Sequence, residues 1–485
     1  MDLTSGGISI LEEVYRINVY VSAAKKENIL NFQQNINMPN QKKYYGEQTE
    51  LALKNFNVSR QKVSLYWVKQ IVEVKRAANQ ANYELKKISR ERYELIEKAI
   101  KKIQTGTYDD QFVTPAIQGG AGTSINMNVN EVIAGLATEL SGGKVKIHYL
   151  NDVNLSQSTN DVLPTALKMA IYVLTEDCIE SLKILEKSLD KKAKEFSGIV
   201  KTGRTHLQDA VPMTLGQEFN AYKMVARRGA ARLNRVRQGM LDLSIGGTAT
   251  GTGVNAGKKY TELTIKHLRK NTGLPVRSAE DLVDATQNVD SFSDVSAGIK
   301  TTLAAITKNA NDLRLLASGP TCGFYEIKLP EMQKGSSIMP GKVNPVIPEL
   351  INQIAFQVYG NDLAVTMVVE HGQLELNVFM SVLAHNLIES LRFFAKGVKI
   401  LAEGCVDGIK ANKENCENYA MKNTTRLTSL TPILGYDKVA RIIKDLNSNR
   451  DLDIREVLEK EGVEKKVLDD LMDAKKLAAS LNGKK

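Results

Sequence analysis

The chain has 485 residues, of which 42% are hydrophobic and 25% are charged, and its formal net charge is +10. With 34 glycines besides, this composition is ordinary for a globular protein and excludes an intrinsically disordered one. The lysines are dispersed, only one tryptophan is present and no run of about 18–20 apolar residues occurs, so neither nucleic-acid binding nor a membrane span is indicated.

The predicted elements change character along the chain. Residues 1–60 are polar without clear periodicity, whereas residues 63–103 have a charged helical pattern. The clearest helix is predicted over 289–316, where apolar residues recur at steps of three and four over about 40 Å. Two further apolar helices are predicted over 346–366 and 378–404. Because helices this long seldom pack alone, we predict a long bundle or a core shared between subunits.

These changes in pattern divide the chain into three predicted domains. A mixed, mainly helical domain is expected over residues 1–158, a bundle of long helices over 159–412, and a small helical domain over 413–485. The few prolines and the abundance of alanine, leucine, lysine and glutamate favour helices over a sandwich or barrel.

The cysteines and histidines indicate in which cellular compartment the protein is expected and whether it is expected to bind a metal. The four cysteines form no CxxC pair, and the start of the chain lacks the basic and apolar regions of a signal peptide. A reduced, cytoplasmic protein is therefore expected. The five histidines show no metal-ligand spacing, so no metal site is predicted.

Four polar segments interrupt the periodic pattern. Each is rich in hydroxyl, amide or glycine residues and adjoins an apolar helix, which is where binding groups often lie. Taken singly, any of them is more simply an ordinary capped loop. The segments are Gly119–Asn130, Asn151–Asp161, Gly203–Pro212 and Gly335–Pro345.

The segment Gly335–Pro345 is the strongest candidate site. Its Lys342, Asn344 and Ser337 suit a carboxylate ligand, because they offer a positive charge and hydrogen-bond donors. A serine is a poor base in water. Ser336 could abstract a proton only if backbone N–H groups, a cation and the exclusion of water stabilised its oxyanion. A loop that contains glycines and ends at a helix could supply all three.

These segments together resemble a known family. Gly335–Asn344 reads Gly-Ser-Ser-x-Met-Pro-x-Lys-x-Asn and resembles the signature loop of the aspartase/fumarase superfamily. Asn154–Asp161, Gly203–Pro212 and Gly246–Asn255 resemble other segments of that family, and the resemblance runs from about Tyr44 to the C-terminal part. It implies an all-α, three-domain fold whose long helices form a homotetrameric core, with each active site built from three subunits.

The flanks of the signature loop favour one branch of the family. Residues 327–333 and 345–353 resemble aspartate ammonia-lyases more than fumarases. The implied activity is the reversible deamination of L-aspartate to fumarate and ammonia, by a carbon–nitrogen lyase without a cofactor. A divalent cation could activate such an enzyme, but no residues are assigned to it. Two alternatives stay open, namely fumarate hydratase, acting on fumarate and L-malate, and a non-catalytic structural relative.

The resemblance also implies a role for each matching residue. Ser336 abstracts a proton from Cβ of L-aspartate, which leaves an aci-carboxylate (enediolate), and His206 and Lys342 complete the catalytic set. The hydroxyl groups expected to bind the aci-carboxylate are those of Thr123, Ser158, Thr159 and Ser337. The groups expected to hold the α-carboxylate are Thr205, Lys342 and Asn344, and those expected at the amino group are Asn160 and His206.

The chain departs from the family pattern in three places, one of which is the arginine that is expected soon after Tyr44–Thr49 and is missing here. Residues 148–154 lack the proline and the second histidine usual there and are one residue short. In fumarases this region binds a second carboxylate, so the resemblance does not extend to that second site. Thr321 stands where the family usually has an arginine.

Overall fold

The computed structural model describes residues 42–449 and 452–483. Residues 45–485 form one compact unit, which contains every described helix and strand. Helices dominate this unit and its strands are short, which confirms the predicted all-α fold. Residues 1–41 of the predicted N-terminal domain lie outside the described part of the chain.

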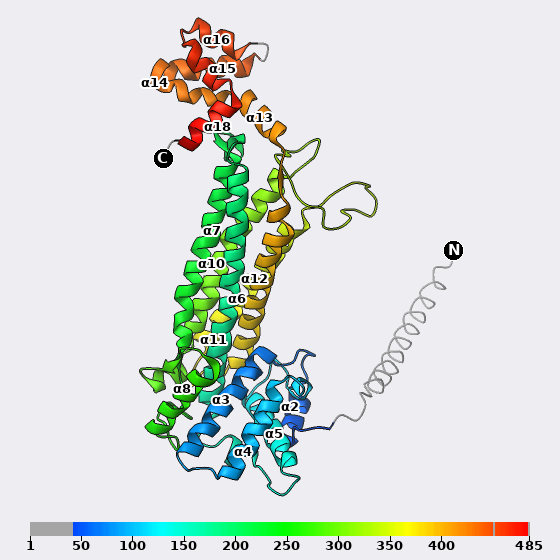
Figure 1. Ribbon diagram of the computed structural model, residues 1–485, viewed down its shortest axis with the longest axis vertical. Coiled ribbons are helices and arrows are strands. Elements are labelled where there is room, and N and C mark those ends of the chain that lie inside the picture. Colours follow the sequence, from blue (N-terminus) through cyan, green and yellow to red (C-terminus); the bar gives the residue numbers. More distant parts are fainter. Residues whose placement is uncertain (1–41, 450–451, 484–485) are drawn as a thin grey trace, which may run out of the picture. The chain divides into compact units, whose positions relative to one another are not determined.

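Five long helices form a bundle (Figure 1). They are α6 (Thr159–Glu195), α7 (Leu215–Val236), α10 (Asp290–Leu316), α11 (Val346–Glu370) and α12 (Met380–Gly404). Helix α6 packs against α7 and α12, and α10 packs against α7 and α11. The helices predicted over 289–316, 346–366 and 378–404 are confirmed as α10, α11 and α12. No helix in the described ranges combines the length and the apolar character needed to cross a bilayer.

The bundle is held by a continuous apolar core and by close contacts between helices. On α10, Phe292, Ile299 and Leu303 are fully buried, as their helical spacing predicts. On α7, Gly229 lies so close to α10 that an added Cβ would come within 2.5 Å of the Thr302 methyl group. A larger residue than glycine would therefore force these two helices apart.

A smaller group of helices packs around the N-terminal end of α6. It consists of α2 (Glu47–Asn55), α3 (Leu65–Glu84), α4 (Arg90–Gln104), α5 (Thr123–Leu140), α8 (Lys258–Thr272) and the short α9 (Leu282–Gln287). The helical pattern predicted over 63–103 is thus two helices, separated by residues 85–89. Helix α3 contacts α4, α6 and α8, and the Trp67 indole N–H donates to the Leu163 carbonyl oxygen (3.1 Å).

At the C-terminal end of α6 lies an antiparallel hairpin, with the small C-terminal helices packed on it. This hairpin is formed by β1 (Val200–Thr205) and β2 (Gln208–Thr214). Elsewhere, β3 (Asp242–Leu243) pairs with β4 (Arg277–Ser278) in a parallel arrangement, and β5 (Ile327–Lys328) pairs with β6 (Lys410–Ala411) in an antiparallel one. The C-terminal helices are α13 (Lys413–Lys422), α14 (Thr431–Leu434), α15 (Tyr436–Ser448), α16 (Ile454–Lys460), α17 (Lys465–Leu471) and α18 (Ala474–Gly483). Leu427, Leu458 and Leu468 belong to their apolar cluster. Helix α6 begins at Thr159 and α13 at Lys413, but the division into three domains stays a prediction because residues 45–485 form one unit.

Glu131 on α5 anchors the start of α2. Its carboxylate accepts hydrogen bonds from the backbone N–H groups of Gly46 (2.9 Å), Gln48 (2.9 Å) and Thr49 (3.2 Å), and from the Thr49 hydroxyl (2.6 Å). A carboxylate is the natural acceptor for the unsatisfied N–H groups of a helix N-terminus.

Replacing this carboxylate with an amide tests the anchor. We expect Glu131→Gln to lower the free energy of unfolding by about 2–3 kcal/mol, because an NH₂ group would replace an acceptor for backbone N–H groups. Urea unfolding followed by circular dichroism measures the change. Glu91→Gln, at an exposed carboxylate in the first turn of α4, is the matched control. Equal stabilities of the two variants would contradict the assignment.

Candidate functional site

Four of the predicted site residues lie together at the N-termini of α5 and α6. Thr123 is the first residue of α5, and Ser158 caps α6, accepting a hydrogen bond from the backbone N–H of Asn160 (3.2 Å). Ala121, Thr159 and Asn160 line one small cavity. Helix N-termini carry partial positive charge and unsatisfied N–H groups, so this end of the bundle suits an anion.

A network of asparagines lies beneath these hydroxyl groups. The amide nitrogen of Asn126, one turn after Thr123 on α5, donates to the Thr159 hydroxyl oxygen (3.1 Å). Asn126 is only 2% exposed. Since this bond uses Thr159 as the acceptor, the Thr159 hydroxyl hydrogen is available to a ligand. Asn126 was not predicted to be a functional residue, although it lies within the polar segment Gly119–Asn130.

Asp161 fastens the glycine-rich segment Gly246–Asn255 to the start of α6. This buried carboxylate accepts hydrogen bonds from the backbone N–H groups of Ser158 (2.9 Å), Gly246 (3.0 Å) and Thr248 (3.0 Å). Burial raises the pKa of Asp161 to about 6, although the three N–H groups lower it. The role of Asp161 was also missed, but its signal was the spacing Ser158-x-x-Asp161, which is that of a capping box.

Thr205 and His206 lie elsewhere, at the tip of the hairpin β1–β2. Thr205 pairs with Gln208, so His206 and Leu207 form a two-residue turn, and both have positive φ (58° and 61°). Both side chains are exposed. The turn therefore holds Thr205 and His206 at the surface, beyond the C-terminal end of α6.

Ser336 lies in a loop whose neck is closed by hydrogen bonds. The backbone N–H of Gly335 donates to the Lys342 carbonyl oxygen (3.0 Å), and the Asn344 amide donates to the Gly335 carbonyl oxygen (2.6 Å). An added Cβ on Gly335 would come within 2.1 Å of the Lys342 carbonyl oxygen, so only glycine fits there. Ser337 and Lys342 are exposed.

The Ser336 hydroxyl oxygen has two backbone donors within its own loop. It accepts from the N–H groups of Ile338 (3.2 Å) and Met339 (3.0 Å). Two N–H groups on one oxygen stabilise negative charge there, which is what a serine must have in order to act as a base.

Buried ion pairs connect the hairpin to the segment before this loop. Glu326, which has no exposed surface, pairs with Lys201 (2.8 Å) and Arg204 (2.8 Å) of β1, and Lys201 also pairs with Glu218 (2.7 Å). Burial alone lowers the pKa of Lys201, but the two carboxylates outweigh burial and hold it above its ordinary value. The hairpin and the Ser336 loop therefore share one end of the bundle.

The predicted site residues thus form two groups within one chain. Thr123, Ser158, Thr159 and Asn160 lie at the N-terminal end of α6. Thr205 and His206 lie beyond its C-terminal end, and the Ser336 loop projects from the side of the bundle toward that same end (Figure 1). At about 1.5 Å per residue, the 37 residues of α6 span roughly 55 Å. A single chain therefore does not bring the two groups together.

The stretch that departs from the family pattern forms a π-helical turn, Tyr149–Val153. His148 Nδ1 accepts from the backbone N–H groups of Leu150 and Asn151 (both 3.1 Å), and Arg92 pairs with Asp152 (2.5 Å). This turn leads directly into Asn154 and the α6 N-terminus.

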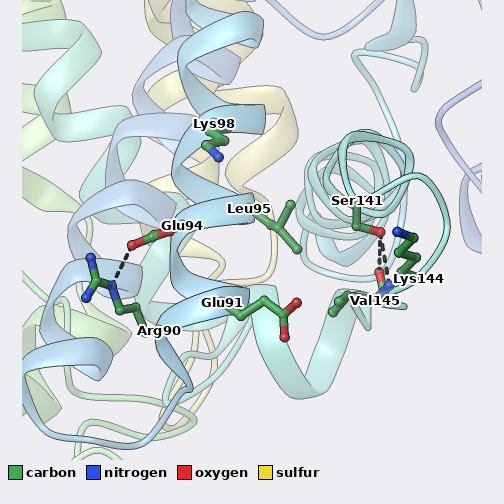
Figure 2. Close-up of a pocket in the computed structure, with 8 residues that line it drawn as sticks. All are labelled: Arg90, Glu91, Glu94, Leu95, Lys98, Ser141, Lys144 and Val145. Atoms are coloured by element: carbon green, nitrogen blue, oxygen red, sulfur yellow. Dashed lines mark hydrogen bonds and ion pairs between the residues drawn. The ribbon is translucent and has the colours of Figure 1, made fainter.

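A larger cavity, of about 500 Å³, lies between the first turns of α4 and the turn after α5 (Figure 2). Its charged lining residues are Arg90, Glu91, Glu94, Lys98 and Lys144. Arg90 is paired with Glu94 (2.7 Å), and no predicted site residue lines the cavity. Within the described ranges, no group of three histidine, cysteine, aspartate or glutamate side chains is arranged to hold a metal ion.

Comparison with known proteins identifies the relatives. The sequence profile of a lyase family matches residues 38–360. The aspartate ammonia-lyase of Bacillus sp. is 46% identical over 424 residues, which cover 87% of this chain and 90% of that one. The structure of a fumarate lyase:delta crystallin from Brucella melitensis matches with a TM-score of 0.86 and 42% identity, covering 90% and 96% of the two chains. A class II fumarase from Schistosoma mansoni matches with a TM-score of 0.86 and 34% identity, covering 91% and 97%.

Proposed function

The chain belongs to this lyase family, the aspartase/fumarase superfamily, and from that premise we propose that it is an aspartate ammonia-lyase. Such a carbon–nitrogen lyase converts L-aspartate reversibly into fumarate and ammonia. The observation that carries the proposal is the identity of 42–46% with aspartate ammonia-lyases over most of the chain. Identity with the Schistosoma mansoni fumarase is lower, at 34%.

Fumarate hydratase is the second candidate, because the Schistosoma mansoni fumarase has the same fold as this chain, with a TM-score of 0.86 that equals that of the Brucella melitensis protein. Both activities need a base at Cβ and a site for two carboxylates, so the described side chains support either reaction. They differ in the group that leaves, which is ammonia in one reaction and water in the other.

In the proposed mechanism, Ser336 acts as an alkoxide that takes the proton from Cβ of L-aspartate. The N–H groups of Ile338 and Met339, which already point at its oxygen, support the alkoxide. The exposed ammonium group of Lys342 adds positive charge within the same loop. The electron pair left on Cβ passes into the β-carboxylate, which becomes an aci-carboxylate with two negative charges.

Hydroxyl donors then bind the aci-carboxylate more tightly than they bind the substrate, and this difference accelerates the reaction. We assign this role to Thr123, Ser158, Thr159 and Ser337. The partial positive charge at the N-termini of α5 and α6 acts in the same direction.

The remaining groups orient the other end of L-aspartate. We assign the α-carboxylate to Thr205, Lys342 and Asn344, and the amino group to Asn160 and His206. When the aci-carboxylate collapses, its electron pair forms the double bond between Cα and Cβ and the bond to nitrogen breaks. Ammonia leaves and fumarate remains. None of these steps requires a cofactor, and we assign no residues to an activating cation.

The two separated groups of residues support a site shared between subunits. We propose a homotetramer in which subunits bring the α6 N-terminus of one chain to the hairpin and Ser336 loop of others. Exposed apolar side chains on α11, namely Phe356 (66% exposed), Leu363 (62%) and Met367 (51%), offer a surface for such packing. We place the enzyme in the cytoplasm, where its four thiols, which form no disulfide, would stay reduced; they are Cys178, Cys322, Cys405 and Cys416.

One assay separates the candidate activities. We expect the purified protein to form fumarate from L-aspartate, measured by the ultraviolet absorbance of fumarate, and not from L-malate. Fumarate from L-malate alone would replace the proposal with fumarate hydratase. No fumarate from either compound would favour a non-catalytic relative.

Removal of the Ser336 hydroxyl tests the base. We expect Ser336→Ala to lower kcat for L-aspartate by about 10²–10⁴-fold, because a general base is lost. Light scattering should show an unchanged oligomer, since the loop is not part of the bundle core. Retained turnover would remove Ser336 from the role of base.

Mixed oligomers test the shared site. Ser336→Ala and Thr159→Val should each be nearly inactive alone, because each removes one essential hydroxyl group. Co-expression of the two variants should restore activity at up to about a quarter of the sites, since some sites then combine an intact Ser336 loop with an intact Thr159. If co-expression restores nothing, both residues come from the same chain and the proposed assembly is wrong.

A further inference from the structure

Lys75 is a buried lysine close to the proposed aci-carboxylate site. It lies on α3, is only 1% exposed, and its ammonium group donates to the side-chain oxygen of Asn154 (2.7 Å). Burial lowers the pKa of Lys75 to about 7, while the Asp161 carboxylate acts to raise it. A charged donor that is shielded from water forms a stronger hydrogen bond than an exposed one. The bond from Lys75 therefore fixes the orientation of the Asn154 side chain.

The Asn154 oxygen receives further donors. The amide nitrogens of Asn126 (3.1 Å) and Asn130 (3.2 Å) also donate to it, and Asn130 is completely buried. Lys75 in its ammonium form can only donate, and together with the Asn130 amide it holds the Asn154 oxygen as an acceptor. Asn126 must then present its NH₂ group, since its own oxygen would face another oxygen.

The same NH₂ group of Asn126 makes a second hydrogen bond, to the Thr159 hydroxyl oxygen (3.1 Å). The direction of donation is therefore set along the whole chain of contacts. Lys75 donates to Asn154, Asn126 donates to both Asn154 and Thr159, and Thr159 can donate only outwards. This outward direction is the one that a negatively charged ligand requires.

We propose that Lys75 is a positioning residue that, through Asn154 and Asn126, directs the Thr159 hydroxyl as a donor to the aci-carboxylate. The proposal rests on the proposed function, because it assumes that this intermediate forms beside Thr159. A positively charged group behind the hydroxyl also favours the intermediate over the substrate, since the intermediate carries one more negative charge at that end.

Two inhibitors separate this role from a merely structural one. Succinate has the carbon skeleton and the two carboxylates of L-aspartate, without its amino group. The nitronate of 3-nitropropionate has a nitrogen in place of one carboxyl carbon and carries two negatively charged oxygens where those of the aci-carboxylate would be. A positioning residue for the intermediate affects the nitronate selectively, whereas a general loss of structure weakens both ligands.

The first variant is Lys75→Met, which keeps an unbranched side chain and removes the charge. We expect kcat for L-aspartate to fall about 10- to 100-fold, and the Kd of the nitronate to rise by a similar factor. KM for L-aspartate and the Kd of succinate should change less than about threefold. Isothermal calorimetry on the intact enzyme measures both inhibitors directly.

The matched control is Lys168→Met. Lys168 is also a buried lysine (6% exposed) whose pKa burial lowers, but it lies on α6 and donates to the Asp242 carbonyl oxygen (2.8 Å). Its loss removes a buried ammonium group without touching Asn154 or Thr159. We expect kcat and the Kd of the nitronate to stay within about threefold of those of the unaltered enzyme.

If Lys75→Met does not fold, Asn126→Asp carries the test, because it is isosteric and replaces the donor by an acceptor. The carboxylate would accept from Thr159 and turn its hydroxyl hydrogen away from the ligand. The same selective loss of nitronate binding is expected. Equal weakening of both inhibitors, or unchanged nitronate binding, would overturn the role of Lys75. An unaltered protein that binds both inhibitors but forms no fumarate would instead contradict the proposed function, and one that binds neither would overturn both.

Discussion

The length and rigidity of α6 are the constraint on which the rest of the molecule depends. Its N-terminus carries Ser158 and Thr159, and its C-terminus leads into the hairpin that carries Thr205 and His206. A straight helix of roughly 55 Å cannot fold back on itself, so no loop movement within the chain could join the two ends. In the proposed tetramer, subunits packed in opposite directions would place the N-terminal end of α6 of one subunit beside the C-terminal end of α6 of another. The long bundle is then both the scaffold of the fold and the means of assembling the site.

Much of the fold was predictable because apolar periodicity is a local property. The pattern over 289–316 predicted α10 to within one residue, since helical spacing of apolar side chains is readable without knowledge of their partners. The break between α3 and α4 was not predicted. Residues 85–89 contain no proline or glycine to mark it, and the contacts that define it, such as Lys87 with Ser156 (3.0 Å), connect distant segments. Sequence periodicity carries no information about such contacts.

In the candidate site, too, features that depend on local sequence were predictable, and features that depend on contacts between distant segments were not. The four polar segments were found from residue type and spacing, and their roles came from the resemblance to the family. The supporting residues Lys75, Asn126 and Asp161 were not found. Lys75 lies in a charged helical pattern and Asn126 and Asp161 lie in polar segments, so solvated side chains would be expected, whereas tertiary packing buries all three. Their function lies in the direction of their hydrogen bonds, which only the three-dimensional arrangement reveals.

The direction of the hydrogen bonds distinguishes two kinds of hydroxyl group in the proposed site. Thr159 accepts from one side-chain amide, and its oxygen keeps a hydrogen that can be donated to a ligand. Ser336 accepts from two backbone N–H groups, and these stabilise its oxygen most when the hydrogen has been lost. Similar chemical groups are thereby prepared for opposite tasks, one to bind negative charge and the other to bear it. The reaction needs both at the same carbon skeleton, and α6 holds them at opposite ends of each chain. Assembly would therefore be a condition of the chemistry, because only neighbouring subunits could complete the pair.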